Sequence, residues 1–213
     1  MKNKIFVLLV AVFAGIAFTG CEKEETTANV SRITYYPVMS VKGDQFMCIK
    51  VGEAFTDPGV SAQINGVDVA VNTVGAVDNT TIGVYTIVYE VTNADGFKKS
   101  LSRIVGVVDP TVSANNFAGT YNRSANQVQT KITKISDGFY FVDNVGGVDP
   151  ANQAYSFPVY FYNLKGMTVE VPEQPNPLGG TVYCDNVTFT TTKYSWVVMG
   201  AGFGTALRTF IKK

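Results

Sequence analysis

The sequence predicts an all-β protein that has two β domains behind a short leader. After residue 31, turns rich in Gly, Pro, Asn and Asp recur about every 8–12 residues, and β-branched and aromatic runs fill the intervals. No stretch of that region shows the 3.6-residue apolar period of an amphipathic helix. Residues 110–116 have the composition of a linker. We therefore expect an N-terminal β-sandwich followed by a small antiparallel β-barrel, with a second β-sandwich as the alternative for the second domain.

The first 20 residues have the features of a cleaved export signal. Lys2 and Lys4 supply positive charge, and residues 5–18 are almost wholly apolar. This run is shorter than the about 20 apolar residues that a membrane-spanning helix needs. A signal peptide over residues 1–20 is therefore the better interpretation than a transmembrane anchor.

The end of this segment, Phe18-Thr19-Gly20-Cys21, resembles the lipobox of bacterial lipoproteins. The resemblance implies that the signal is removed before Cys21, and that Cys21 receives a diacylglycerol and a further acyl chain such as palmitate. Two or more acyl chains hold a protein stably on a bilayer. We therefore expect Cys21 to anchor the protein to outer-membrane lipid without spanning the membrane.

A charged run follows the cysteine directly. Lys23, Glu24 and Glu25 resemble the export signal of surface lipoproteins in Gram-negative bacteria that use Sus-like glycan-uptake systems. The resemblance implies an outer-membrane protein that faces the cell exterior. The alternative is an ordinary charged stretch in a flexible tether. Residues 21–31 form that tether, and it could reach up to about 35 Å.

Composition argues against several functions. The chain has 17 Lys+Arg and 17 Asp+Glu, and the signal removes two lysines, so the mature side chains sum to 15 − 17 = −2. This balance gives no reason to expect a nucleic-acid partner. There is no histidine, hence no imidazole base and no Ser-His-Asp arrangement. We expect a protein that is not an enzyme, with no catalytic residue, metal ligand or cofactor.

Two groups of residues could still carry chemistry. The nearest approach to paired carboxylates is Glu170 with Glu173 and Asp143 with Asp149, but such acids are common in loops.

Besides Cys21, the chain has Cys48 and Cys184, which fall in separate predicted domains. We expect them to be buried free thiols, with a disulfide as the alternative.

Residues 32–109 resemble the bacterial surface immunoglobulin-like domains that occur as repeats in cell-surface proteins. The matching pieces are Val51-Gly52-Glu53, residues 55–60, residues 83–89, residues 93–96 and residues 103–109. Predicted strands lie near residues 33–41, 45–51, 67–74, 84–92 and 100–108. Asp57-Pro58-Gly59 reads as a turn, Tyr85 resembles a tyrosine corner, and Asp95-Gly96 favours a hairpin. The resemblance implies a spacer or protein-interaction module without an active site.

The second domain, residues 117–213, has eight predicted strands, which suit a small barrel. They lie near residues 119–123, 127–135, 138–143, 155–162, 168–171, 181–190, 194–199 and 205–211. Its two ends, residues 117–121 and 207–212, resemble those of calycins. The resemblance implies a barrel in which Arg208 packs on Tyr121. It also implies one alternative function, the carriage of an apolar ligand.

Aromatic residues concentrate in this second domain. Tyr160 and Tyr162 are predicted to project from the face of their strand that lies opposite its apolar face. Tyr194 and Trp196 are predicted to project from one common face of the strand near residues 194–199. Exposed rings of this kind can stack on sugars, so these four are the candidate ligand-binding residues. The alternative is that the rings pack a core.

Together these features predict a lipid-anchored cell-surface accessory protein. An immunoglobulin-like spacer would present a β domain that binds an extracellular glycan. The alternatives are a structural or adhesive lipoprotein that contacts an outer-membrane protein complex, and a calycin-like carrier.

Overall fold

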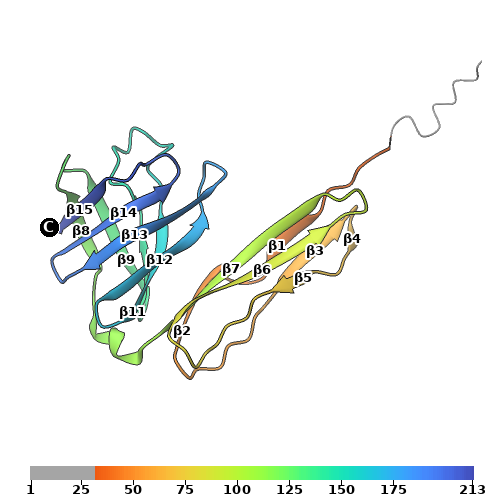
Figure 1. Cartoon of the computed structure of the whole chain (residues 1–213), viewed down its shortest axis with the longest axis horizontal. Coiled ribbons are helices and arrows are strands. Elements are labelled where there is room, and N and C mark those ends of the chain that lie inside the picture. Colours follow the sequence, from red (N-terminus) through yellow and green to blue (C-terminus); the bar gives the residue numbers. More distant parts are fainter. Residues whose placement is uncertain (1–31) are drawn as a thin grey trace, which may run out of the picture. The chain divides into compact units, whose positions relative to one another are not determined.

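The computed structural model describes residues 32–213, which form an all-β fold, as predicted (Figure 1). The predicted signal, Cys21 and the charged run Lys23-Glu24-Glu25 lie outside the described residues. Residues 35–213 make one compact unit. In the part of the chain that is described, no helix has the length and apolarity needed to cross a membrane.

The N-terminal part of this unit consists of two sheets. The first has the order β1 (Val38–Val41), β3 (Val60–Ile64) and β4 (Val67–Asp68). The second has the order β2 (Phe46–Lys50), β7 (Lys98–Val108), β6 (Gly83–Thr92) and β5 (Asn72–Val74). β2 runs parallel to β7 and places Cys48 opposite Gly106. Strand β3 was not predicted, although its short sequence VSAQI alternates apolar and polar residues and buries Ala62.

The predicted turns of this part are confirmed. The Tyr85 hydroxyl donates to the Thr81 carbonyl at 2.9 Å, which is the tyrosine-corner contact. The hairpin between β6 and β7 turns at Gly96, whose φ of 86° favours glycine. At the predicted turn over residues 57–59, the Gly59 N–H donates to the Asp57 carboxylate at 3.1 Å.

A buried arginine ties this turn to both sheets. Arg103 of β7 is fully buried and forms an ion pair with Asp57. Its Nε donates to the Asp44 carbonyl at 3.0 Å, and a terminal nitrogen donates to the Lys42 carbonyl. The Tyr89 hydroxyl lies 2.7 Å from the Asp57 carboxylate. Arg103 therefore holds together segments that precede β2 and β3, which lie in different sheets.

The C-terminal part is a closed barrel, so the alternative of a second sandwich is wrong. Its strands, in barrel order, are β10 (Phe139–Val142), β11 (Val159–Lys165), β12 (Thr168–Pro175), β13 (Thr181–Phe189), β14 (Lys193–Gly200), β15 (Leu207–Lys212), β8 (Gly119–Arg123) and β9 (Gln129–Ser136). The strand predicted from Tyr155 begins only at Val159. Pro158 lacks an N–H for a ladder, and the N–H groups of Tyr155 and Ser156 bond to the Asn152 carbonyl instead.

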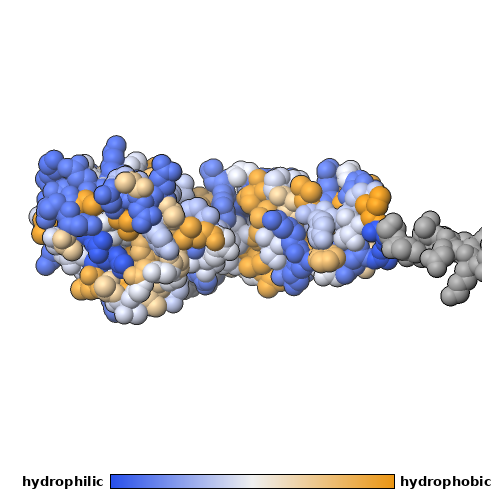
Figure 2. Space-filling view, turned by 90° about the horizontal axis from the view of Figure 1, so that it is seen from above, coloured by the Kyte–Doolittle hydropathy of each residue, from blue (hydrophilic) through white to orange (hydrophobic). Residues whose placement is uncertain are grey.

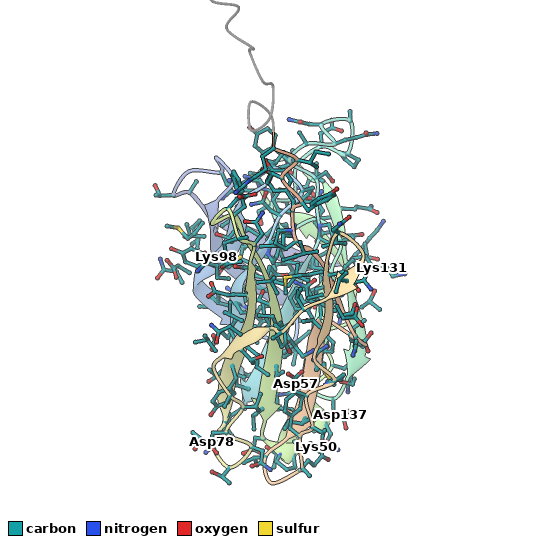
Figure 3. The ribbon with its side chains drawn as sticks, turned by 90° about the vertical axis from the view of Figure 1, so that its right-hand side faces the viewer. Lys50, Asp57, Asp78, Lys98, Lys131 and Asp137 are labelled. Carbon is teal, nitrogen blue, oxygen red and sulfur yellow. The ribbon has the colours of Figure 1, made fainter. Side chains whose placement is uncertain are left out.

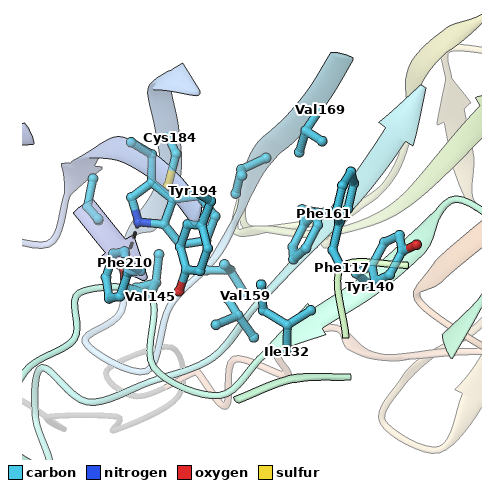
Figure 4. Close-up of a cluster of buried hydrophobic side chains, with 14 of the residues drawn as sticks. Phe117, Ile132, Tyr140, Val145, Val159, Phe161, Val169, Cys184, Tyr194 and Phe210 are labelled. Carbon is cyan, nitrogen blue, oxygen red and sulfur yellow. Dashed lines mark hydrogen bonds between the residues drawn. The ribbon is translucent and has the colours of Figure 1, made fainter. Parts of the chain in front are cut away.

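Aromatic side chains fill the barrel interior (Figure 4). Tyr194 stacks on Phe210 with ring centroids 4.5 Å apart, and its hydroxyl bonds to Thr130 at 2.9 Å. The Trp196 indole Nε1 donates to the Val145 carbonyl at 2.9 Å. Because side chains occupy this interior, the packing argues against the apolar-carrier alternative.

The contact expected between Arg208 and Tyr121 is wrong. The Arg208 guanidinium lies 5.1 Å from the ring centroid of Phe203, whereas Lys212 lies over the Tyr121 ring at 5.7 Å. Arg208 also donates to the carbonyls of Phe203 and Ala206, so it supports the loop before β15. On the face drawn in Figure 2, hydrophilic residues cover much of the barrel and hydrophobic ones form small groups.

The Arg103 cluster generates a prediction about pH. Burial alone would raise the pKa of the Asp57 carboxyl, but hydrogen bonds from Tyr89 and Gly59 and the charge of Arg103 lower it below its usual value. Asp57 therefore contributes stability that is present above its unfolded pKa of about 3.9 and is lost as pH falls through its lower folded pKa. Asp57→Asn leaves the Arg103 charge buried and unpaired, so at pH 7 it should cost about 3 kcal/mol.

Urea denaturation at several pH values measures this effect. The free-energy gap between wild type and Asp57→Asn should shrink below about pH 4. A gap that stays constant down to pH 2 would contradict the assignment. Asp185→Asn, at an exposed acid that forms no side-chain hydrogen bond within residues 32–213, is the control.

Candidate functional site

Three of the four candidate ligand-binding rings are buried, so the predicted surface platform is wrong for them. Tyr194 and Trp196 point into the barrel and are 1% exposed or less. Tyr162 projects outward, as predicted, but it is fully buried against the N-terminal sheets. Tyr160, which projects from the same outer face, remains half-buried and reaches solvent.

Tyr162 belongs to a second hydrophobic core that joins the N-terminal sheets to the barrel. This junction core consists of Ile104, Val108, Val112, Phe139, Tyr162 and Leu164. The Tyr162 hydroxyl donates to the Ile104 carbonyl at 3.2 Å. A Cβ on Gly106 would lie 2.3 Å from a carbon of the Tyr162 ring, so the ring packs directly on the β7 backbone. The Asp109 N–H also donates to the Leu164 carbonyl at 2.8 Å.

The segment between the two β structures takes part in this core. Residues 110–114 form a 3₁₀ helix, η1 (Pro110–Ala114). Asp109 is its N-cap residue, and Pro110 lies in its first turn. Its Val112 side chain is fully buried in the junction core. The connection is therefore a packed element of the structure.

Charges line one border of the junction. Asp137 accepts from Lys134 at 3.0 Å and from Lys50 at 3.3 Å, and Lys50 and Asp137 are labelled near each other in Figure 3. Hydrogen bonds from these two lysines lower the pKa of Asp137. The Cys48 thiol lies 3.6 Å from the Asp137 carbonyl, and burial raises its pKa to about 12. Cys48 and Cys184 are both free thiols, as predicted, though Cys48 is only half-buried.

Beside the junction core lies an open cleft with a volume of about 360 Å³, which we call the junction cleft. Its lining residues are Asp44, Gln45, Phe46, Ile135, Phe139 and Tyr160. The Tyr160 ring stacks on Phe46 at 4.3 Å between centroids, with 23° between the ring planes. Phe139 stacks on Tyr160 from within the barrel sheet at 5.5 Å. The cleft therefore has aromatic walls from both β structures.

The polar side of the cleft has a fixed backbone and available side chains. Arg103 Nε holds the Asp44 carbonyl, and the Ile104 N–H donates to the Gln45 carbonyl at 2.9 Å. The side chains of Asp44 and Gln45 form no hydrogen bond with another residue in the described range 32–213. A carboxylate and an amide are thus free to bond a ligand next to apolar rings.

A glutamine that sequence reasoning missed holds Tyr160 in position. Gln174 of β12 is buried, and its side chain accepts from the Tyr160 N–H at 2.8 Å and donates to the Tyr160 carbonyl at 2.9 Å. The backbone pairing of β11 with β12 includes Tyr162 and Glu170 but not Tyr160, so the Gln174 side chain supplies the contact that the ladder lacks there. The available signal was Pro172, because a proline inside a strand removes a ladder donor.

Three of the acids considered for catalysis accept hydrogen bonds from neighbouring strands and turns of the barrel part. Asp143 accepts from the Lys131 N–H, Asp149 from the Ala151 N–H and Glu173 from the Thr181 hydroxyl. Burial raises the pKa of Glu170. Within residues 32–213, no three acidic, cysteine or histidine side chains gather as a metal site would require.

Comparison with known proteins supports the immunoglobulin-like part of this architecture. Residues 39–107 match the family model described as a bacterial surface protein, Ig-like domain. The chain thus carries a domain of bacterial cell-surface proteins, as the sequence resemblance predicted. No curated protein shows significant similarity to the chain.

Solved structures with similarity to the chain include a lipoprotein, BT2262 from Bacteroides thetaiotaomicron. It is 23% identical, with a TM-score of 0.41, and the alignment covers 84% of this chain and 100% of that one. Two structures of Clostridium perfringens ZmpB align over smaller shares of their own length. One holds CBM51-2 with GlcNAc and INT domains, at 16% identity, TM-score 0.30 and coverage of 62% of this chain and 30% of that one. The other holds the M60 catalytic domain with CBM51-1 and CBM51-2, at 13% identity, TM-score 0.32 and coverage of 85% and 21%.

The packing of the junction core predicts that a larger residue at position 106 destabilises the protein. Gly106→Ala should lower the free energy of unfolding by about 1–3 kcal/mol, because the new methyl group overpacks the Tyr162 ring. Gly180→Ala is the matched control, since its Cβ would come no closer than 3.5 Å to another residue. Urea denaturation compares the two. Equal stability of both variants would contradict the packing described here.

Gln174 gives a prediction at the cleft itself. Gln174→Ala leaves the Tyr160 N–H and carbonyl without their side-chain partners, so it should cost about 1–3 kcal/mol. Amide hydrogen exchange at Tyr160 should become faster. Gln153→Ala, at an exposed loop position, should change neither quantity. Unchanged exchange at Tyr160 in Gln174→Ala would show that the glutamine does not hold this strand.

Proposed function

We propose that this protein is a lipid-anchored cell-surface accessory protein that binds an extracellular carbohydrate in the junction cleft, without catalysing its conversion. The observation that carries the proposal is the combination of stacked aromatic rings with an unpaired carboxylate and amide in one open cleft.

Carbohydrate chemistry fits these groups. A sugar ring presents apolar C–H faces, which pack on aromatic rings, and hydroxyls, which donate to carboxylates and bond to amides in both directions. Tyr160, Phe46 and Phe139 supply the apolar surface. Asp44 and Gln45 supply the polar groups. The cleft volume of about 360 Å³ is at the lower end of the usual range for small-molecule sites, which suits one or two sugar rings.

The proposal gives the immunoglobulin-like domain a second role. Asp44, Gln45 and Phe46 come from this domain, so it contributes half of the cleft and is more than a spacer. The surface Ig-like family, together with the predicted lipid on Cys21 and the export signal at residues 23–25, supports a location on the cell exterior.

Affinity electrophoresis of the chain without its signal, against plant, host and microbial polysaccharides, tests the proposal. Retardation by a glycan should weaken about two- to tenfold in Gln45→Ala, because one hydrogen bond to the sugar contributes about 0.5–1.5 kcal/mol. Asp44→Ala should weaken binding by at least as much, since bonds to a charged group are stronger. Tyr155→Ala removes an exposed ring of the barrel outside the cleft and is the control.

The outcomes separate the alternatives. Binding that survives both cleft substitutions would move the site elsewhere. Failure to bind any polysaccharide would favour the structural or adhesive alternative, and co-purification of an outer-membrane complex would then identify the partner. The intact mass of the protein from membranes tests acylation of Cys21 independently.

A further inference from the structure

Three aromatic side chains are exposed together at one end of the N-terminal sheets. Tyr35, Tyr36 and Phe97 are 43%, 61% and 46% exposed. The Tyr36 and Phe97 rings contact each other, with centroids 4.9 Å apart. We call this group the aromatic end. Tyr35 and Tyr36 precede β1, and Phe97 lies in the turn between β6 and β7.

The backbone of the aromatic end is rigidly held by a buried asparagine. The Asn93 side chain donates to the Tyr35 carbonyl at 2.9 Å and accepts from the Phe97 N–H at 2.8 Å. The Asn93 N–H donates to the Phe97 carbonyl at 3.0 Å. These bonds connect the Tyr35 segment to the hairpin, so the exposed rings stand on an ordered support. Grouped exposed rings on an ordered surface indicate an interaction site.

The place of this group in the chain indicates what it meets. Tyr35 follows the predicted lipid-carrying Cys21 by 35 − 21 = 14 residues, which can span at most about 50 Å. Among the residues of the compact unit, those at its start are therefore the most tightly restricted to the neighbourhood of the membrane. A short tether also raises the effective concentration of a weak contact between this end and the lipid.

The charges beside the rings suit a lipid surface. Lys98 and Lys99 directly follow Phe97, and both are exposed. Lys98 pairs with Glu90 at 3.1 Å, whereas Lys99 has no ion pair within the described residues. Tyrosine and lysine are the residue types that meet the headgroup region of bilayers, where a ring inserts and an ammonium group bonds phosphate.

We propose that the aromatic end docks on the bilayer that holds Cys21, with Tyr36 and Phe97 inserted among the headgroups and Lys99 bound to anionic lipid phosphate. The inference rests on the proposed lipid anchor. β7 runs from the aromatic end to the junction core, and Lys98 and Ile104 are about 20 Å apart along it. Docking would therefore hold the junction cleft at a set height and orientation above the membrane.

Vesicle flotation of the unlipidated chain, residues 22–213, tests the contact without the anchor. With vesicles of phosphatidylethanolamine and a minority of phosphatidylglycerol, Tyr36→Ser/Phe97→Ser should lower the partition coefficient by about tenfold or more. Met167→Ser/Leu178→Ser removes two equally exposed apolar side chains from the barrel and should leave it unchanged. Thermal unfolding of each variant confirms that the fold is retained. Absence of flotation by the wild-type chain overturns the proposal, as does equal loss in both double variants.

A second pair of measurements reports the depth and charge of the contact. Tyr36→Trp should show a blue-shifted emission that brominated lipid quenches, whereas Leu178→Trp should show neither effect. Lys99→Glu should weaken flotation on anionic vesicles and leave flotation on phosphatidylcholine vesicles unchanged. No quenching of Tyr36→Trp overturns insertion, and equal loss on both vesicle types overturns the role of Lys99.

These results are separable from those on the proposed function. Gln45→Ala should float like wild type, and Tyr36→Ser/Phe97→Ser should bind polysaccharide like wild type. A wild-type chain that binds glycan but does not float refutes the docking surface, one that floats but binds no glycan refutes the cleft, and an unmodified Cys21 mass refutes the anchor.

Discussion

The packing of Tyr162 on the bare backbone of Gly106 is the constraint on which the rest of the structure depends. A tyrosine on the outer face of a barrel strand would ordinarily meet water, but here its ring lies against β7 and its hydroxyl bonds to the Ile104 carbonyl. Only glycine at position 106 permits this approach. The contact makes β11 apolar on both faces, and it converts two β structures that could be independent into one unit with a junction core.

The junction cleft follows from this arrangement, because its walls belong to both structures. Phe46 lies on β2, which is paired with β7, and Tyr162 packs on β7. This pairing brings Phe46 to Tyr160. Two buried polar side chains then fix the cleft. Arg103 holds the backbone of Asp44, and Gln174 holds the backbone of Tyr160. Gln174 bonds to backbone atoms, and Arg103 bonds to backbone carbonyls and to the Asp57 carboxylate, so the aromatic and polar groups of the cleft keep their positions without a ligand. Such preorganisation lowers the entropy cost of binding.

Much of the fold could be predicted from the sequence, because strand alternation and turn residues are local signals. The eight barrel strands, the Asp57–Gly59 turn and the outward direction of Tyr160 and Tyr162 followed from period and turn chemistry. The site could not be predicted in the same way. Whether an outward ring is exposed depends on what another domain places against it. The N-terminal sheets bury Tyr162 fully, whereas Tyr160, which stacks on Phe46, stays half-buried. The remaining rings, Tyr194 and Trp196, alternate with Lys193 and Ser195, and this local pattern is that of an apolar strand face that turns into the barrel.

The most direct test of the central claim, that a shared junction core makes one unit of the two β structures, is differential scanning calorimetry of the chain without its signal. A single transition, whose calorimetric and van't Hoff enthalpies agree, is the predicted result for wild type. Tyr162→Ala should then separate the unfolding of the immunoglobulin-like domain from that of the barrel into two transitions. Two transitions already present in the wild-type protein would contradict the account, because the domains would then unfold independently and the junction cleft would have no fixed walls.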